Sequence, residues 1–197
     1  MFSMSDVYIA RKDLADIIDV RNDKLNSINN HNLRVSEMSV KLAAAVGFSS
    51  EDINQVLIGS YLHDIGKIFL ENDILQGDQP LSMIQKEEIL RHTRLGHSYL
   101  NGVSGLDKAK EIILYHHERV DGKGYPDGLV GSEIPLHVRI VSICDSYDAM
   151  TSYRAYKPRK MTHEEAIKEL TNYSGTQFDA ELVEIFINQF NISYSNN

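Results

Sequence analysis

The spacing of apolar residues along the chain predicts helices almost throughout. Between residues 13 and 46, leucine, isoleucine and valine recur every three or four positions, the period of an α-helix with one buried face. We expect this helix to break near Asn29 and Asn30 and to end at Gly47. His31 lies four residues before Val35 and therefore shares the buried face.

The same period predicts six more helices, and no segment alternates convincingly as a strand would. Residues 119–137 interrupt the pattern with four glycines and two prolines, and so long a loop inside a compact domain is usually functional. The predicted fold class is therefore all-α. The six helices are expected at residues 51–63, 82–100, 106–118, 138–152, 162–171 and 179–189.

Composition narrows the class of protein and of partner. The 197 residues suit one domain, and 42% hydrophobic and 24% charged residues are typical of a soluble globular protein. We find no membrane span and no signal peptide, and the single cysteine, Cys144, excludes an intrachain disulfide and a cysteine-rich zinc site. A net charge of −8 argues against a nucleic-acid polymer as partner, although local cations could still bind a small phosphorylated ligand. We expect a cytoplasmic protein.

Several polar residues lie on inward helix faces or at helix ends, where they are candidate metal ligands. Neighbours on a helix point about 100° apart, so His116 and His117 are expected to fan out towards two adjacent metal ions. Without thiolates, imidazole and carboxylate ligands favour iron first and manganese second, with zinc a weaker choice. Structural roles without a metal are an alternative. A lone inward histidine is usually a hydrogen-bonded core residue, and histidines also suit a helix C-terminus. The seven candidates are His31, His63, Asp64, His92, His116, His117 and Asp145.

Two motifs in order resemble the HD-GYP family of cyclic di-GMP phosphodiesterases, a branch of the HD superfamily. The first is His-Asp-Ile-Gly-Lys at 63–67, and the second is His-His-Glu-Arg-Val-Asp-Gly-Lys-Gly-Tyr-Pro at 116–126. His92 with Gly96, and Asp145, complete the pattern. The resemblance covers residues 30–190, which leaves residues 1–29 as a predicted helical extension and 191–197 as a predicted flexible tail.

The resemblance implies an HD-domain helical bundle with a binuclear metal site in its core, held by the seven candidates. Asp64 is the expected bridging ligand and, with Lys67, a catalytic residue. Lys67, Arg154 and Lys157 are expected to contact substrate phosphates, and Tyr125 to shape the pocket. A hydroxide shared by the two metals would open cyclic di-GMP to linear pGpG, with onward hydrolysis to GMP left open.

One departure from the family concerns the metal count. Some relatives hold a third metal with a glutamate four residues before the first histidine, where this chain has Ser27. A hydroxyl replaces a carboxylate poorly, so we expect two metals.

Other functions remain open at this point. A mixed guanine–adenine cyclic dinucleotide is a second candidate substrate. A binding or interaction module without turnover, and a single-metal HD phosphohydrolase, are alternative functions, although His92, His116 and His117 count against the latter. A regulatory protein partner or a homodimer would be compatible with any of these.

Overall fold

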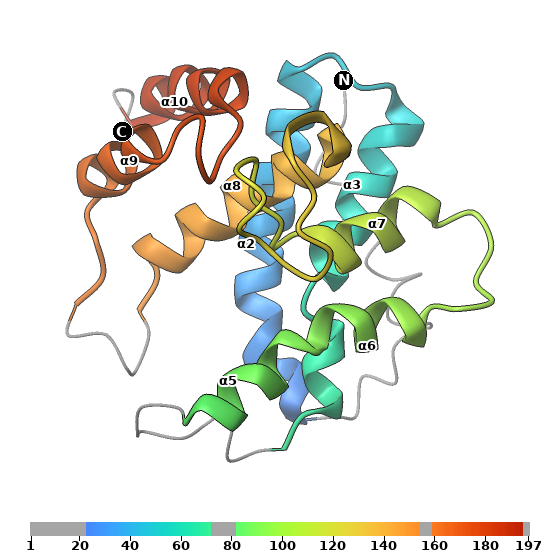
Figure 1. The fold of residues 1–197 in the computed structure, drawn as a ribbon. Coiled ribbons are helices and arrows are strands. Elements are labelled where there is room, and N and C mark those ends of the chain that lie inside the picture. Colours follow the sequence, from blue (N-terminus) through green and yellow to red (C-terminus); the bar gives the residue numbers. More distant parts are fainter. Residues whose placement is uncertain (1–22, 72–81, 154–158, 195–197) are drawn as a thin grey trace.

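The computed structural model describes residues 23–71, 82–153 and 159–194, and these ranges are helical, which confirms the all-α prediction (Figure 1). Within them there is no strand, only two isolated bridges that join Asp121 to Val130 and Ser174 to Phe178. The elements are α2 (Asp23–Ala45), α3 (Ser50–Leu62), η1 (Ile65–Phe69), α5 (Met83–Leu90), α6 (His92–Tyr99), α7 (Asp107–Tyr115), η2 (Gly131–Glu133), α8 (Leu136–Thr151), α9 (His163–Asn172) and α10 (Ala180–Tyr194).

The first described helix, α2, is continuous, so the break expected near Asn29 and Asn30 is wrong. Asparagine lowers helix propensity by less than about 1 kcal/mol, and the packing of α2 along α3 and α8 outweighs that cost. The end of α2 follows the prediction. Gly47 has φ +89°, and the amides of Gly47 and Phe48 donate to the carbonyls of Ala44 and Ala43, which closes the helix.

One of the expected helices is divided in the structure, and another ends earlier than expected. The single helix expected at 82–100 is two, α5 and α6, which meet at Arg91. Ser82 caps α5 through a capping box with Gln85, as its sequence suggests. Helix α7 ends at Tyr115, so His116 and His117 lie in the turn that follows it.

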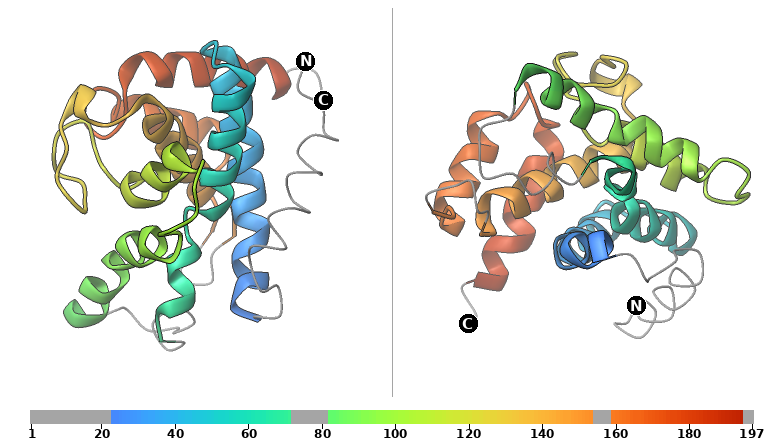
Figure 2. Two further views of the ribbon diagram at one scale, coloured as in Figure 1. Left: turned by 90° about the vertical axis from the view of Figure 1, so that its right-hand side faces the viewer. Right: turned by 90° about the horizontal axis from the view of Figure 1, so that it is seen from below.

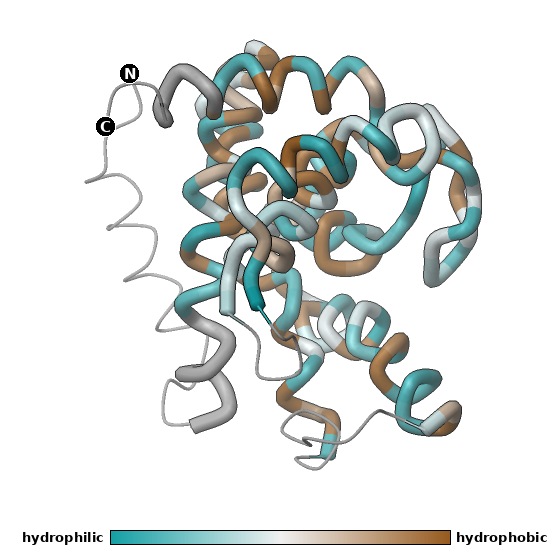
Figure 3. Tube along the Cα trace, turned by 90° about the vertical axis from the view of Figure 1, so that its left-hand side faces the viewer, coloured by the Kyte–Doolittle hydropathy of each residue, from teal (hydrophilic) through white to brown (hydrophobic). Residues whose placement is uncertain are grey.

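The helices enclose one large hydrophobic core and one small one. The large core lies among α2, α3, α8, α9 and α10, and the small one contains Leu62, Ile65, Leu100 and Ile113. Two further views show α5 and α6 at the end of the molecule away from α9 and α10 (Figure 2). Hydrophobic and hydrophilic stretches alternate along the helices, as expected for helices buried on one face (Figure 3). None of the described helices is long and apolar enough to span a bilayer.

Candidate metal centre

A first group of candidate ligands gathers where α2, α3 and α8 meet. His31 comes from α2, whereas His63 and Asp64 directly follow α3, and their potential ligand atoms all lie within 4.8 Å of one another. Asp145 of α8 joins them, with Oδ1 3.0 Å from His31 Nε2 and 3.7 Å from His63 Nε2. We call His31, His63 and Asp145 the first cluster and treat Asp64 separately.

A second group consists of three imidazoles, those of His92, His116 and His117, again within 4.8 Å of one another. We call them the second cluster. The Nε2 atoms of His92 and His116 are 3.4 Å apart, and the ring centroids of His116 and His117 are 4.1 Å apart. His116 and His117 therefore lie in the same cluster, because both residues come after the end of α7 and are not part of that helix. His116 is nevertheless close to the first cluster, with its ring centroid 5.0 Å from that of His63.

Asp64 lies between the two clusters and turns one oxygen to each. Its Oδ2 is 3.5 Å from His63 Nε2, and its Oδ1 is 3.4 Å from His92 Nε2. The carboxylate is buried. This is the arrangement that a bridging ligand between two ions requires.

Three of the histidines are oriented by backbone carbonyls close by in the sequence. The Nδ1–H groups of His63 and His92 donate to the carbonyls of Ser60 and Ile89, each three residues earlier, at 2.6 Å. His116 Nδ1 lies 3.1 Å from the carbonyl of Ile113. When Nδ1 carries the proton, Nε2 presents a lone pair, the tautomer that a metal ligand needs.

Unpartnered buried atoms support a cation site in this centre. Among the described residues, His63 Nε2 and Asp64 Oδ1 are buried and have no hydrogen-bond partner. In addition, the Nε2 lone pairs of His92 and His116 face each other. Buried polar groups are nearly always satisfied, and divalent cations held by the two clusters would satisfy these four atoms. The residues present therefore fit the divalent metal that this fold implies.

The two clusters differ in charge. Burial lowers the pKa of His116 far below its ordinary value and that of His117 to about 3, so the second cluster is neutral at pH 7. In the first cluster, burial opposes protonation of His31, but hydrogen bonds to Asp145 and Asp148 outweigh it and raise the pKa to about 9. Burial likewise opposes ionisation of Asp64, yet the charge of Lys67 keeps its pKa well below the usual range.

Two glycines allow the clusters to approach each other. A Cβ on Gly66 would lie 1.8 Å from the carbonyl oxygen of His92 and 2.7 Å from the amide nitrogen of Gly96. A Cβ on Gly96 would lie 2.9 Å from Ile113. The start of α6 therefore rests directly on η1, which brings His92 against Asp64. Gly96 thus permits the close packing of α6 at this point.

The loop after the histidine pair is fastened beside the second cluster by Glu118. This buried carboxylate accepts hydrogen bonds from the backbone amides of Asp127, Gly128 and Leu129, at 2.7, 3.0 and 3.1 Å. Gly124 packs so tightly that a Cβ would lie 2.4 Å from the amide nitrogen of Arg119. As a result the ring of Tyr125 stacks on His117, with centroids 4.8 Å apart and an interplanar angle of 28°.

The cations expected to contact substrate are described only in part. Lys67 lies at the centre, with Nζ 2.6 Å from Asp64 Oδ2, and its side chain is 23% exposed. A cation there faces both the ligands and solvent. Arg154 and Lys157 lie outside the described residues, so their expected phosphate contacts stay predictions.

Sequence reasoning missed two supporting groups. Asp148 accepts a hydrogen bond from His31 Nδ1 at 2.7 Å, and its only signal was its position three residues after Asp145 on one helix face. Glu118 stood inside the second motif, but no pattern showed which amides it would bind. His137, which simple exposure rules would place in solvent, is in fact buried, and its Nε2 lies 2.7 Å from Glu111.

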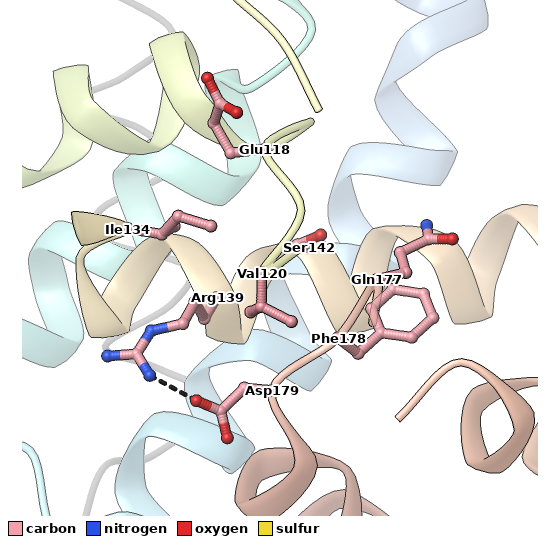
Figure 4. Close-up of a pocket in the computed structure, with 8 residues that line it drawn as sticks. All are labelled: Glu118, Val120, Ile134, Arg139, Ser142, Gln177, Phe178 and Asp179. Atoms are coloured by element: carbon pink, nitrogen blue, oxygen red, sulfur yellow. Dashed lines mark hydrogen bonds and ion pairs between the residues drawn. The ribbon is translucent and has the colours of Figure 1, made fainter. Parts of the chain in front are cut away.

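A small pocket lies behind the loop and apart from this centre (Figure 4). It is lined by Glu118, Val120, Ile134, Arg139, Ser142, Gln177, Phe178 and Asp179, and none of the seven candidate ligands belongs to it. Arg139 of α8 pairs with Asp179 just before α10. The backbone of Val120 and Asp121 donates to Gln177 and Thr176, so this region anchors the base of the loop.

Comparison with known proteins agrees with this geometry. A family model described as "HD domain" matches residues 14–182. This chain belongs to the HD domain family. The predicted HD-GYP assignment and its helical HD-domain fold are thereby confirmed, and a divalent metal is the cofactor that an HD domain implies.

Curated relatives share substantial sequence with this HD domain. A cyclic di-GMP phosphodiesterase from Thermotoga maritima is 39% identical over 159 residues, covering 80% of this chain and 43% of the relative. The cyclic di-GMP phosphodiesterase response regulator RpfG of Xanthomonas campestris is 36% identical, with 78% and 41% covered. The 3'3'-cGAMP-specific phosphodiesterase 2 of Vibrio cholerae is 32% identical, with 88% and 33% covered. The chain thus spans less than half the length of these relatives.

Solved structures share the fold at lower identity. An HDG"Y"P protein from Bdellovibrio bacteriovorus superposes with a TM-score of 0.70 at 19% identity, covering 95% of this chain and 63% of the other. The HD domain of the Listeria monocytogenes phosphodiesterase PgpH, in complex with cyclic-di-AMP, gives 0.61 at 18% identity, covering 86% and 90%.

Proposed function

We propose that this HD domain is a metal-dependent phosphodiesterase that opens cyclic di-GMP to linear pGpG. One observation carries the proposal. Asp64 turns one oxygen to each of two histidine clusters, and among the described residues its Oδ1 and His63 Nε2 are buried without a hydrogen-bond partner. A polar core of this size is costly to bury unless ions satisfy it. The names of the curated relatives described above support the reaction class.

The residues present would hold two divalent ions. His31, His63 and Asp145 would bind one, His92, His116 and His117 the other, and Asp64 would be shared. When bound, such a pair supplies Lewis-acid activation of water and of the phosphate, the chemistry that phosphodiester hydrolysis needs. We propose iron first and manganese second, because the ligand set contains imidazoles and carboxylates but no thiolate.

The chain's own groups would position the substrate around that centre. Lys67, 2.6 Å from Asp64 and partly exposed, places a positive charge where negative charge develops on the phosphoryl oxygens. Tyr125 stacks on His117 and forms one wall of the site. Arg154 and Lys157 follow α8 in the sequence, and we propose that they bind the second phosphate.

Cyclic di-GMP is the first substrate to test, and a mixed guanine–adenine cyclic dinucleotide is the second. Both kinds of phosphodiesterase occur among the relatives with 32–39% identity. We place the enzyme in the cytoplasm, where its activity would be controlled by a protein partner or by homodimer formation.

The direct experiment is to incubate anaerobically purified protein with Fe²⁺ or Mn²⁺ and each cyclic dinucleotide, and to separate the products by chromatography. We expect cyclic di-GMP to be converted to pGpG. Asp64→Asn should abolish conversion, and Asp52→Asn, which removes an ion pair with Lys108 remote from the centre, should not.

The same assay tests the alternative of a non-hydrolysing binding module. Tight cyclic di-GMP binding at full metal occupancy, with no pGpG formed under reducing conditions, would contradict the proposed enzyme and support that module instead.

A further inference from the structure

His31 differs from the other histidines in what orients it. His63, His92 and His116 are held by carbonyls three residues earlier in the chain, so each is oriented by local backbone structure. His31 Nδ1 instead donates to Asp148 Oδ2 at 2.7 Å, a residue 117 positions later on α8. Its orientation therefore depends on a contact between two helices.

Asp148 is itself held in place by an extended set of contacts. Arg34, one turn after His31 on α2, donates from Nε to Oδ1 at 2.5 Å and from Nη2 to Oδ2 at 2.9 Å. Ser152 Oγ lies 3.1 Å from Oδ2 and accepts from Arg34 Nη2 at 2.9 Å. The Asp148 side chain is only 3% exposed, whereas that of Arg34 is 46% exposed. A bidentate guanidinium thus fixes both oxygens of the carboxylate.

We propose that Asp148, held by Arg34 and Ser152, is a positioning residue that aims His31 at the metal of the first cluster. The inference rests on the proposed metal centre and adds Asp148 as the group that orients one of its ligands. A carboxylate that accepts the Nδ1 proton leaves Nε2 as the ligand atom and increases its basicity. No other candidate ligand has such a long-range orienting contact among the described residues. The first cluster should therefore be the one that a change at Asp148 weakens.

The predicted effect is selective. Loss of an outer carboxylate of this kind costs about 10- to 100-fold in metal affinity. Asp148→Asn should impose that loss on one of the two ions and leave the other, at the second cluster, with its original affinity. Arg34→Met, at a more exposed position, should weaken the same ion by a smaller factor. The matched control is Asp52→Asn, whose ion pair with Lys108 lies away from the centre.

The test is titration of metal-free protein with Mn²⁺, reading free Mn²⁺ by electron paramagnetic resonance. A double-mutant comparison sharpens it, because Asp148 can act on the metal only through His31. In a His31→Ala background, Asp148→Asn should cause no further loss of affinity. An equal further loss in that background, or equal weakening of both ions in Asp148→Asn alone, would show a general structural role and overturn the inference.

Failure of the inference and failure of the proposed centre give different results. Two ions bound with unchanged affinity by Asp148→Asn would overturn the positioning role and leave the centre standing. Absence of bound Mn²⁺ from the unmodified protein would overturn the centre and the inference together.

Discussion

The two clusters joined by Asp64 are built in different ways. The second cluster is made of three neutral imidazoles, and two of them are oriented by carbonyls three residues earlier in the chain. The first cluster combines imidazoles with the carboxylate of Asp145, and His31 reaches its partners on another helix. The second cluster thus forms when α6 packs on α7 but is oriented by local contacts, whereas the orientation of His31 also depends on the packing of α2 on α8.

This difference teaches where the centre is sensitive to change. The second cluster is protected by the loop that Glu118 fastens and by Tyr125, which stacks on His117. The first is surrounded by charged groups, Lys67 on one side and Arg34 with Asp148 on the other. Substitutions should therefore separate the clusters, except at Asp64, which touches both.

The largest effect is expected at Asp64. Asp64→Ala removes the only candidate ligand that faces both clusters, so both ions should be lost or greatly weakened. We expect hydrolysis to fall roughly 10³-fold, about 4 kcal/mol of barrier. Elemental analysis with a chromatographic assay checks both points. Retention of two tightly bound ions would show that the clusters do not share this carboxylate.

Loss of a single cluster should follow substitution of a histidine that belongs to only one. His117→Ala should lower metal content by about one ion per chain while the helical fold persists, as circular dichroism would show. His31→Ala should weaken binding of the other ion. Near-full occupancy in His117→Ala would remove His117 from the ligand set.

A smaller effect is expected where a charge acts without ligating. Lys67→Ala should leave metal content intact and slow turnover by about 10²-fold, because a preorganised cation stabilises charge that develops on phosphate. Lys108→Ala, which removes a cation paired with Asp52, is the control. Unchanged turnover in Lys67→Ala would mean that Lys67 does not act on the substrate.

The loop beside the second cluster offers a more modest change. Gly124→Ala places a methyl group 2.4 Å from a backbone nitrogen, so the loop must shift and Tyr125 must leave His117. We expect a destabilisation of about 1–3 kcal/mol in thermal or denaturant unfolding, with slower turnover and normal metal content. The exposed Lys123→Ala in the same loop should leave stability unchanged. If Gly124→Ala is as stable as Lys123→Ala, the close approach of this loop is not needed for stability.

The smallest effect is expected at Ser27 and concerns the number of metal ions that the protein binds. Because α2 is continuous from Asp23, Ser27 lies one helical turn before His31. Ser27→Glu would add a carboxylate there and should raise the metal count towards three without removing either existing ion. Three stoichiometric ions in the unmodified protein would contradict our interpretation of Ser27.

Local signals in the sequence predicted most of the fold. Ser49, Ser82 and Gly47 mark helix ends by capping chemistry, and the structure places the ends there. The predictions that failed are those in which tertiary packing outweighs the local signal. Packing along α2 overrides two asparagines, and the kink at Arg91 divides a run that has a single hydrophobic period.

The candidate site likewise has residues that the sequence could predict and contacts that it could not. Its seven candidate ligands stood out as histidines and aspartates in recognisable motifs, and the structure brings all seven together. The groups that orient them could not be found so easily. The partner of His31 Nδ1 is 117 residues away, and the amides that Glu118 binds become neighbours only when the loop folds. Such contacts depend on packing, which no local pattern contains.

The most direct test of the shared centre is to add Fe²⁺ or Mn²⁺ stepwise to metal-free protein under anaerobic conditions and to follow cyclic di-GMP opening at each step. If Asp64 joins two ions into one reactive centre, activity should stay low through the first equivalent and rise steeply with the second. Full activity at one equivalent per chain would contradict the account.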